Sequence, residues 1–324
     1  MQMWPITGTE LVYVFMDVHP KNVYALPVPQ PATESRWEVP FFRYKPNHFT
    51  EETDPLKTNS MGFRSPEILI PKPKGIFRIL CIGGSTTHEA GQNAVTYPMR
   101  LETLLKRKFP EQPCEVINAG IPGIFSQGHL LRLHDYLKVE PDLVIAHLGV
   151  NDTLNIYKNP ATNIPAKATH FIRLLMPAIA APDLNTFHNS LNSSMGQNLR
   201  FLSEQLQRQG IALAFVSMPY PDPKIITEDQ YQFFDYQGKQ SWDIPAFSLN
   251  QYASYITISN NLLKTIAAET QSVYIPLAES MAGITEVYND FCHMTQPGIN
   301  AKAEIIFDGI KPLVARHIET HRQR

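Results

Sequence analysis

One stretch of the sequence, Phe77 to Thr86, constrains the fold more than any other. Its apolar run ends at Gly83 and Gly84, and Ser85 follows directly. An apolar strand followed by a glycine turn places the next side chain at the carboxyl end of a parallel sheet, where open α/β sheets build their sites. Glycine suits this turn because a β-carbon obstructs its backbone angles and close approaches. We therefore take Ser85 as a candidate nucleophile.

The chain around this stretch alternates apolar strands with amphipathic helices. Five strands separated by helices predict one parallel sheet with right-handed crossovers and helices on both faces. The helix after the second strand is expected to begin with Ser126 as its N-cap and to bury Leu130, Leu133 and Leu137. Strands are predicted over 78–82, 114–118, 142–148, 211–218 and 272–277, and helices over 97–108, 126–137, 198–209, 249–269 and from about residue 298 to the end.

The sequence predicts one main domain, residues 73–324, with an N-terminal extension and two insertions. A chain of 324 residues is long enough to bury a sizeable core. Residues 1–72 are rich in proline and aromatic residues, so we expect an irregular extension that packs across the main domain. Residues 153–195 and 220–248 are expected to be irregular insertions or lids. The aromatic residues of the second insertion either line an acyl or glycan pocket or form a small satellite core.

Charge and cysteine content exclude several classes of protein. The net charge of −2, with scattered basic residues, gives no electrostatic basis for binding nucleic acid or an anionic membrane. Three scattered cysteines argue against a disulfide framework and a zinc knuckle. No window approaches the ~18–20 apolar residues of a membrane-spanning helix. No signal peptide opens the chain, which favours the cytoplasm if Met1 is the natural start and an extracytoplasmic location if the N-terminus has been trimmed.

Groups that a serine acyl-transfer site needs follow the predicted strands. Ser85 follows the first strand, Gly123 the second and Asn151 the third, while Asp290 and His293 follow the fifth. The Asp290 carboxylate can reach one imidazole nitrogen of His293, which leaves the other nitrogen free to take the Ser85 proton. The backbone N–H groups of Ser85 and Gly123, with the Asn151 amide, can then hold the oxyanion.

These segments resemble, in order, the blocks of the SGNH hydrolases, also called GDSL-type esterases and lipases. The resemblance covers roughly residues 76–315. It implies a flavodoxin-like three-layer α/β/α fold, a five-stranded parallel sheet of order 2-1-3-4-5, and ester hydrolysis with no cofactor and no metal. The matching blocks are Gly83–Thr86, with Gly84 where the family usually has aspartate, Asn118–Gly123, Gly149–Asp152 and Asp290–His293; Asn59–Arg64 also resembles a leader of a family subset, often extracytoplasmic or membrane-tethered.

The resulting hypothesis is a serine esterase that forms an acyl-enzyme on Ser85, with a small-molecule or carbohydrate ester of a short acyl group as substrate. An O-acyltransferase with a sugar hydroxyl as acceptor uses the same site and stays open, as does a non-catalytic binding module on a hydrolase fold. A dinucleotide site is disfavoured because the sequence after Gly83 lacks G-x-G-x-x-G, and a P-loop because no G-K-[ST] follows. A metal hydrolase would need a larger cluster of ligands than Asp290 and His293 supply.

Several other polar residues have simpler expected roles. We expect His88 and Glu89 in a solvated first helical turn, with a role in shaping the pocket next to Ser85 as the alternative. Arg64 is expected to pack the N-terminal extension against the main domain rather than to bind a substrate anion. A buried, hydrogen-bonded position is predicted for His147, and surface positions on a helix for His129 and His134.

Overall fold

The structure is a computed structural model that describes residues 23–25, 42–44, 46–47, 57–89, 92–158, 182–240 and 248–322. Its centre is a five-stranded parallel sheet of order β4-β3-β5-β6-β7. Since β3 is the first of these strands in the chain, this order is the predicted 2-1-3-4-5, and the fold prediction is confirmed. The strands are β3 (Phe77–Gly83), β4 (Cys114–Gly120), β5 (Leu143–His147), β6 (Ala212–Val216) and β7 (Val273–Ile275).

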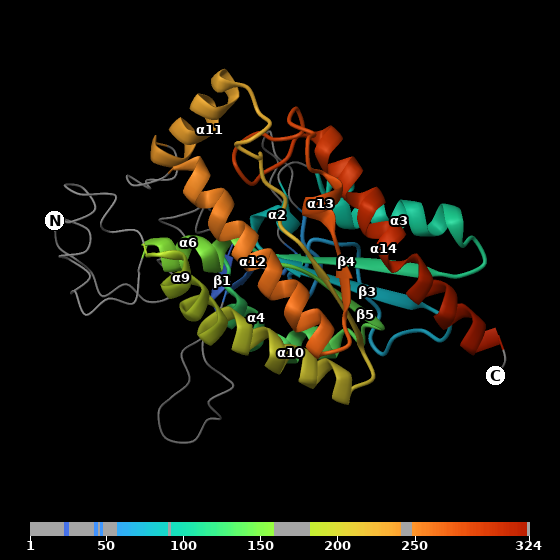
Figure 1. Ribbon diagram of the computed structural model, residues 1–324. Coiled ribbons are helices and arrows are strands. Elements are labelled where there is room, and N and C mark those ends of the chain that lie inside the picture. Colours follow the sequence, from blue (N-terminus) through green and yellow to red (C-terminus); the bar gives the residue numbers. More distant parts are fainter. Residues whose placement is uncertain are drawn as a thin grey trace.

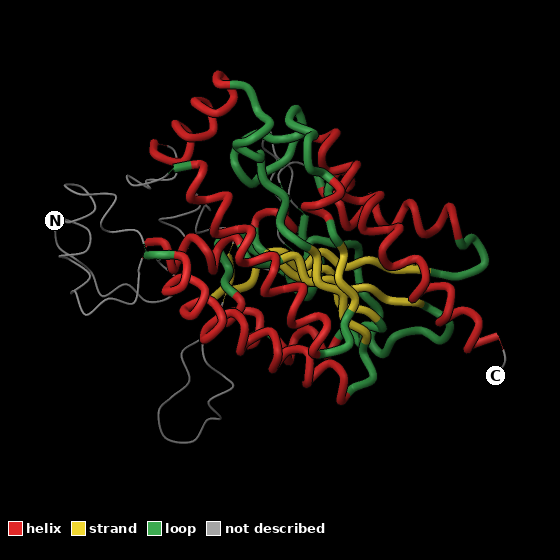
Figure 2. The backbone as a smooth tube through the Cα atoms, viewed as in Figure 1, coloured by secondary structure: helices red, strands yellow, loops and turns green. Residues whose placement is uncertain are grey.

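Helices cover both faces of the sheet, with α3 and α14 in one layer and α4, α10 and α12 in the other (Figure 1). Figure 2 shows the strands as a twisted layer between these helices. The helices are α2 (Ser85–His88), α3 (Tyr97–Lys108), α4 (Ser126–Leu131), α5 (Leu133–Lys138), α6 (Val150–Lys158), α9 (Leu184–Leu191), α10 (Gln197–Arg208), α11 (Glu228–Gln240), α12 (Leu249–Glu269), α13 (Leu277–Ser280) and α14 (Gln296–Arg322), with a 3₁₀ turn at Asn93–Val95 and a π-helical turn at Asn192–Gly196.

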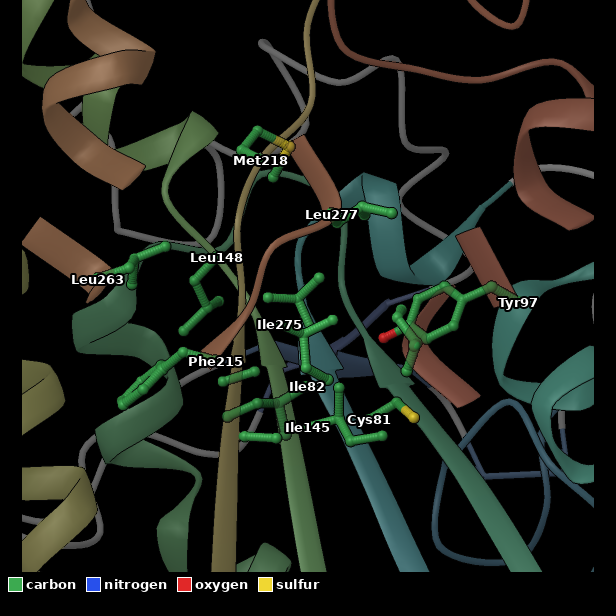
Figure 3. Packing of buried hydrophobic residues seen from close by; sticks show 14 of the residues in the cluster. Cys81, Ile82, Tyr97, Ile145, Leu148, Phe215, Met218, Leu263, Ile275 and Leu277 are labelled. Carbon is green, nitrogen blue, oxygen red and sulfur yellow. The ribbon is translucent and has the colours of Figure 1, made fainter. Parts of the chain in front are cut away.

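The main core lies between the sheet and its two helical layers (Figure 3). Cys81 and Ile82 of β3, Ile145 of β5 and Phe215 of β6 are fully buried there. Burial of each large apolar side chain contributes about 1.5–3 kcal/mol, so the middle strands are fixed most firmly. The ends of these strands carry the candidate site, and a firm core below them keeps those ends in place.

The helix predicted over 126–137 is divided and buries a different face. Arg132 ends α4, because its backbone N–H is shared between the carbonyls of Gly128 and His129, both at 3.2 Å. The predicted apolar residues are only half-buried, whereas Ser126, His129, Arg132 and Tyr136 are each at most 1% exposed. Ser126 is also not the N-cap, which is Phe125. The prediction failed because this face is polar in sequence and finds its partners in the fold.

His129 is one of these partnered residues, and its expected surface position is wrong. Its Nδ1 lies 2.7 Å from the hydroxyl of Tyr136 on α5. Burial, together with the nearby Arg132 charge, lowers the pKa of His129 to about 3. His134 is exposed, as predicted.

Acid should destabilise the fold through His129. The unfolded chain protonates this imidazole near pH 6.5 and the folded protein only near pH 3, so its contribution is complete above pH 6.5 and is lost as the pH falls. At about 1.4 kcal/mol per pH unit, roughly 3 kcal/mol is lost between pH 6.5 and 4. Denaturant melts across this range should show a shallower pH dependence for His129→Gln than for wild type, whereas His134→Gln should keep the wild-type slope. Equal slopes for both variants would contradict the prediction.

The two insertions are more regular than predicted. Within 153–195, α6 extends to Lys158 and α9 packs on the main domain, with Phe187 stacked on Tyr255 of α12 at 4.3 Å between ring centroids. Within 220–248, α11 forms and buries Phe234 against Tyr288. Residues 159–181 and 241–247 lie outside the described residues, so the lid and pocket hypotheses stay predictions for them.

Part of the N-terminal extension is described, and it packs on the main domain. Phe63 is 1% exposed and belongs to the main core, and the N–H of Arg64 donates to the carbonyl of Asn118 at 3.0 Å. Farther upstream, β1 (Val23–Ala25) and β2 (Phe42–Tyr44) form an antiparallel pair. Most of residues 1–56 lie outside the described part, so the division at residue 72 stays a prediction.

The three cysteines, Cys81, Cys114 and Cys292, are all buried free thiols. In the described ranges, no helix is both long and apolar enough to cross a bilayer.

Candidate active site

Two glycines form the turn between β3 and α2, the short helix that begins with Ser85. A β-carbon on Gly83 would lie 2.2 Å from Oγ1 of Thr87 and 2.5 Å from the carbonyl oxygen of His147. Such contacts are far inside van der Waals distance, so only glycine fits between α2 and β5. Gly84 is the N-cap of α2, and Ser85 is its first residue. The sequence therefore places Ser85 at the carboxyl end of the sheet by excluding side chains from the turn.

Ser85, His293 and Asp290 form one hydrogen-bonded chain. His293 Nε2 lies 2.8 Å from Ser85 Oγ, although the two residues are 208 positions apart. His293 Nδ1 lies 2.8 Å from Asp290 Oδ2. Asp290 Oδ1 accepts the backbone N–H groups of Cys292 and His293 at 2.8 and 2.7 Å, which folds the loop before α14 into a tight turn. The structure thus brings together all three residues that the sequence singled out as a triad.

The environment of Asp290 favours its ionised form. Burial acts to raise the pKa of this carboxyl, but the hydrogen bond from His293 and the two backbone N–H groups outweigh it and lower the pKa. An ionised carboxylate accepts only, so it requires a proton on His293 Nδ1. In that tautomer Nε2 has a free lone pair directed at the Ser85 hydroxyl. The arrangement can therefore remove the proton of Ser85.

Asn151 lies beside the residue that precedes Ser85, because a β-carbon on Gly84 would be 2.5 Å from its Nδ2. Asn151 is near the start of α6, and its Nδ2 donates to the carbonyl of Ile124 at 2.9 Å. Gly123 adopts a φ of +73°, which strains other residues. One Asn151 amide hydrogen holds the Gly123 loop, which leaves the second available to a ligand oxygen. Asn151 of the third block thus contacts the residue that directly follows Gly123, the last residue of the second block.

The sequence matches a known protein family over most of its length. The GDSL-like Lipase/Acylhydrolase family matches over residues 81–299. The chain belongs to this family. No curated protein sequence matches it. Among solved structures, the acetylxylan esterase Axe2 from Geobacillus stearothermophilus is 17% identical with a TM-score of 0.47, and LAE5, an alpha/beta hydrolase enzyme from the metagenome of Lake Arreo, Spain, is 14% identical with a TM-score of 0.46; each alignment covers 72% of this chain and 94% of the other.

As a GDSL-like acylhydrolase, the protein is a serine esterase, and its departure at Gly84 has a structural reason. A β-carbon on Gly84 would lie 2.5 Å from Nδ2 of Asn151. The family's usual aspartate therefore has no room here unless the Asn151 amide moves. The space above Gly84 is occupied by the amide that we expect to bind the oxyanion, so a side chain at position 84 requires that amide to shift.

Substituting Gly84 with alanine should consequently lower kcat of the esterase. The methyl group displaces the Asn151 amide, and loss of one oxyanion donor costs about 10²–10³-fold in kcat. Steady-state hydrolysis of p-nitrophenyl acetate measures this loss. Gly210→Ala is the control, since Gly210 has a φ of +71° but no atom within 4 Å of where the added methyl group would lie; it should lose stability and keep kcat. Wild-type kcat in Gly84→Ala would show that the Asn151 amide does not depend on the empty space at Gly84.

Asp152, the next residue of the third block, fixes the start of α6. Its carboxylate accepts the Ser126 hydroxyl at 2.6 Å and the Ser126 N–H at 3.1 Å. Burial raises the pKa of Asp152 to about 6, against the lowering effect of the bonds from Ser126. Through its bonds to Ser126, Asp152 joins the start of α6, which carries Asn151, to the start of α4, the helix that follows Gly123. This link is missing from the sequence-based prediction, because the local pattern favours Ser126 as a helix cap.

Residues close to Ser85 are more buried than the sequence predicts. Glu89 is only 6% exposed rather than solvated, and His88 is half-buried and stacked on Tyr44. Burial, and then the charges of Arg64 and His293, hold the pKa of His88 well below its usual range. His147 is buried, as predicted, but neither ring nitrogen has a hydrogen-bond partner among the described residues, so the hydrogen-bonded part of that prediction is wrong. Arg64 packs the N-terminal extension against the main domain, as predicted, and its side chain is 1% exposed.

Cys292 lies between Asp290 and His293 in the same loop. Its Sγ is 3.5 Å from His293 Nδ1, and burial, with the Asp290 charge, raises the pKa of the thiol well above its usual range. In the described part of the chain, the ligand atoms of Asp290, Cys292 and His293 lie within 4.8 Å of one another and could hold a metal ion. A metal there would replace the proton on Nδ1 and break the bond that orients His293. Metal binding and general-base catalysis are therefore mutually exclusive uses of these atoms.

Proposed function

We propose that this esterase cleaves carboxylic esters of short acyl groups through an acyl-enzyme on Ser85. The observation that carries the proposal is the continuous chain from Ser85 Oγ through His293 to Asp290, with both hydrogen bonds at 2.8 Å. A serine hydroxyl is a weak nucleophile until an oriented base accepts its proton. This chain supplies the base and the group that orients it.

In the first half of the reaction, Ser85 Oγ attacks the ester carbonyl carbon while its proton passes to His293 Nε2. Asp290 stabilises the imidazolium that forms. The backbone N–H groups of Ser85 and Gly123, with the Asn151 amide, bind the oxyanion. His293 then protonates the leaving alcohol, and the acyl group stays on Ser85. In the second half, His293 takes a proton from the water that attacks the acyl carbonyl carbon. It then gives this proton to Ser85 Oγ as the ester bond to Ser85 breaks and the acid leaves.

A short acyl group is supported by how little of the site is exposed. Ser85 and Asn151 are each only 8% exposed. An acyl carbonyl must reach both of these largely buried residues, and a small acetyl group does so more easily than a longer chain. Initial rates with p-nitrophenyl acetate, butyrate and octanoate test this order. A carbohydrate as the alcohol part is proposed as well, and acetylated oligosaccharides are the substrates that test it.

Labelling with a fluorophosphonate probe, followed by mass mapping of the adduct, tests the nucleophile. We expect one adduct, on Ser85. A folded protein that gives no adduct and leaves p-nitrophenyl acetate intact would favour the non-catalytic binding module. If the adduct forms, product analysis with and without a sugar acceptor separates hydrolysis from acyl transfer, because both share the acyl-enzyme.

A further inference from the structure

The nucleophile lies on a helix that cannot hold its own position. α2 is four residues long, and the N–H of Glu89 closes its single turn on the carbonyl of Ser85 at 2.7 Å. One helical turn is an unfavourable nucleus in isolation, so its geometry must come from tertiary contacts. Part of that contact is direct packing on the sheet, since a β-carbon on Gly120 would lie 2.2 Å from the backbone nitrogen of His88. Further contacts are made by the carbonyl groups at the C-terminal end of α2.

Lys302 binds this carbonyl end from the side of the catalytic histidine. Its Nζ donates to the carbonyl of Thr86 at 2.8 Å and forms an ion pair with Glu89, and both side chains are almost completely buried. The ammonium group also lies 4.8 Å from the ring centroid of Tyr97. Lys302 belongs to α14, the helix that follows the His293 loop. One side chain therefore ties the residue after Ser85 to the segment that carries its base.

Arg64, in the N-terminal extension, binds the same end of α2. Its Nη1 donates to the carbonyl of His88 at 2.7 Å and also to the carbonyl of Glu89. The backbone N–H of Arg64 donates to Asn118 on β4 at 3.0 Å, so the guanidinium is anchored to the sheet. The last carbonyls of a helix lack intrahelical donors and favour cations. Two buried cations from distant parts of the chain thus donate hydrogen bonds to the carbonyl groups at the end of one helical turn.

We propose that Lys302 and Arg64 are positioning residues that hold the Ser85 hydroxyl at hydrogen-bonding distance from His293 by binding the carbonyl end of α2. The inference rests on the proposed role of Ser85 as nucleophile. Both cations act through the backbone of residues 86–89 and not on the reacting atoms. A displacement of about 1 Å at a reacting group can cost about 10²-fold in rate, so a loosened α2 should be detected in kcat.

The test compares Lys302→Met and Arg64→Met with wild type. Methionine keeps the unbranched apolar stem of each side chain and removes its donors, although it is one atom shorter than lysine and lacks the guanidinium of arginine. We expect kcat for p-nitrophenyl acetate, and the rate of fluorophosphonate labelling of Ser85, to fall about 10–10²-fold per folded molecule, with KM changed by less than about threefold. Arg64→Lys, which keeps one cationic donor, should recover part of the loss.

Arg78→Met is the matched control. The Arg78 side chain is also fully buried, forms an ion pair with Glu115 at 2.8 Å and donates to the carbonyl of Val139 at 2.7 Å. It lies at the opposite end of β3, about 20 Å from Ser85 by strand geometry. This variant should lose stability like the others but keep kcat within about twofold.

The outcomes separate the two proposals. If wild type is labelled on Ser85 but Lys302→Met and Arg64→Met keep wild-type kcat while melting earlier, the cations only stabilise the fold and the inference is overturned. If wild type itself is not labelled, the proposed function fails first. Should Lys302→Met not fold because Glu89 is left unpaired, the double variant Glu89→Gln/Lys302→Met removes the ion pair as a unit and should show the same loss of kcat.

Discussion

Ser85→Ala is expected to lower kcat roughly 10⁴–10⁶-fold and to abolish the fluorophosphonate adduct. The variant keeps His293 and the proposed oxyanion donors but has no atom that can form the acyl-enzyme. Its residual rate is that of water attack within the site. The fold should survive, because the lost hydroxyl makes one hydrogen bond to His293, worth about 1 kcal/mol. Active-site titration of wild type and variant, with melting curves for both, measures these effects.

Ser203→Ala is the matched control for this experiment. Ser203 is fully buried on α10, and its hydroxyl donates to the carbonyl of Leu199 at 2.8 Å. It therefore loses a comparable hydrogen bond without touching the site, and kcat should stay within about twofold of wild type. Full esterase activity in Ser85→Ala would show that another group is the nucleophile and would remove the basis of the proposed mechanism.

The sheet and the ends of its strands could be predicted because their signals are local. An apolar run that ends in glycine marks β3, and the bounds of α12, Leu249–Glu269, are those predicted. Asp290 and His293 are also local partners, since a spacing of three closes within one turn. The contact between Ser85 and His293 is not local. It was predicted from the order of strands, because carboxyl ends of parallel strands meet at one edge of the sheet.

The positions of the buried polar side chains could not be predicted from local sequence patterns. His129 and Arg132 lie on a polar face that a periodicity argument assigns to solvent, and only the fold supplies their partners, including the Phe63 ring 5.6 Å from the Arg132 guanidinium. Lys302 did carry a signal, since it interrupts the apolar stripe of α14 that runs through Ile299, Ala303 and Ile306. Its contact with Thr86 spans 216 residues, however, and no spacing rule reaches that far.

Asp290→Asn is expected to lower kcat by about 10⁴-fold with little change in KM. In wild type, the carboxylate keeps a proton on His293 Nδ1, which leaves Nε2 free to accept the proton of Ser85 at 2.8 Å. Asparagine can instead turn its NH₂ group toward Nδ1. That contact favours the tautomer with the proton on Nε2, which cannot act as the base. Steady-state kinetics with p-nitrophenyl acetate give kcat and KM separately.

The tight turn at Asp290 should survive this substitution. A loss of kcat would then report the changed tautomer of His293 and not a displaced loop. The carbonyl oxygen of asparagine can still accept the backbone N–H groups of Cys292 and His293 that Asp290 Oδ1 accepts now. Asp308→Asn, at an exposed carboxylate on α14, is the control for the loss of one negative charge and should keep kcat. If Asp290→Asn kept wild-type kcat, the orientation of His293 would not depend on the carboxylate. The triad would then reduce to the pair of Ser85 and His293, with the tight turn of the loop as the only role left for Asp290.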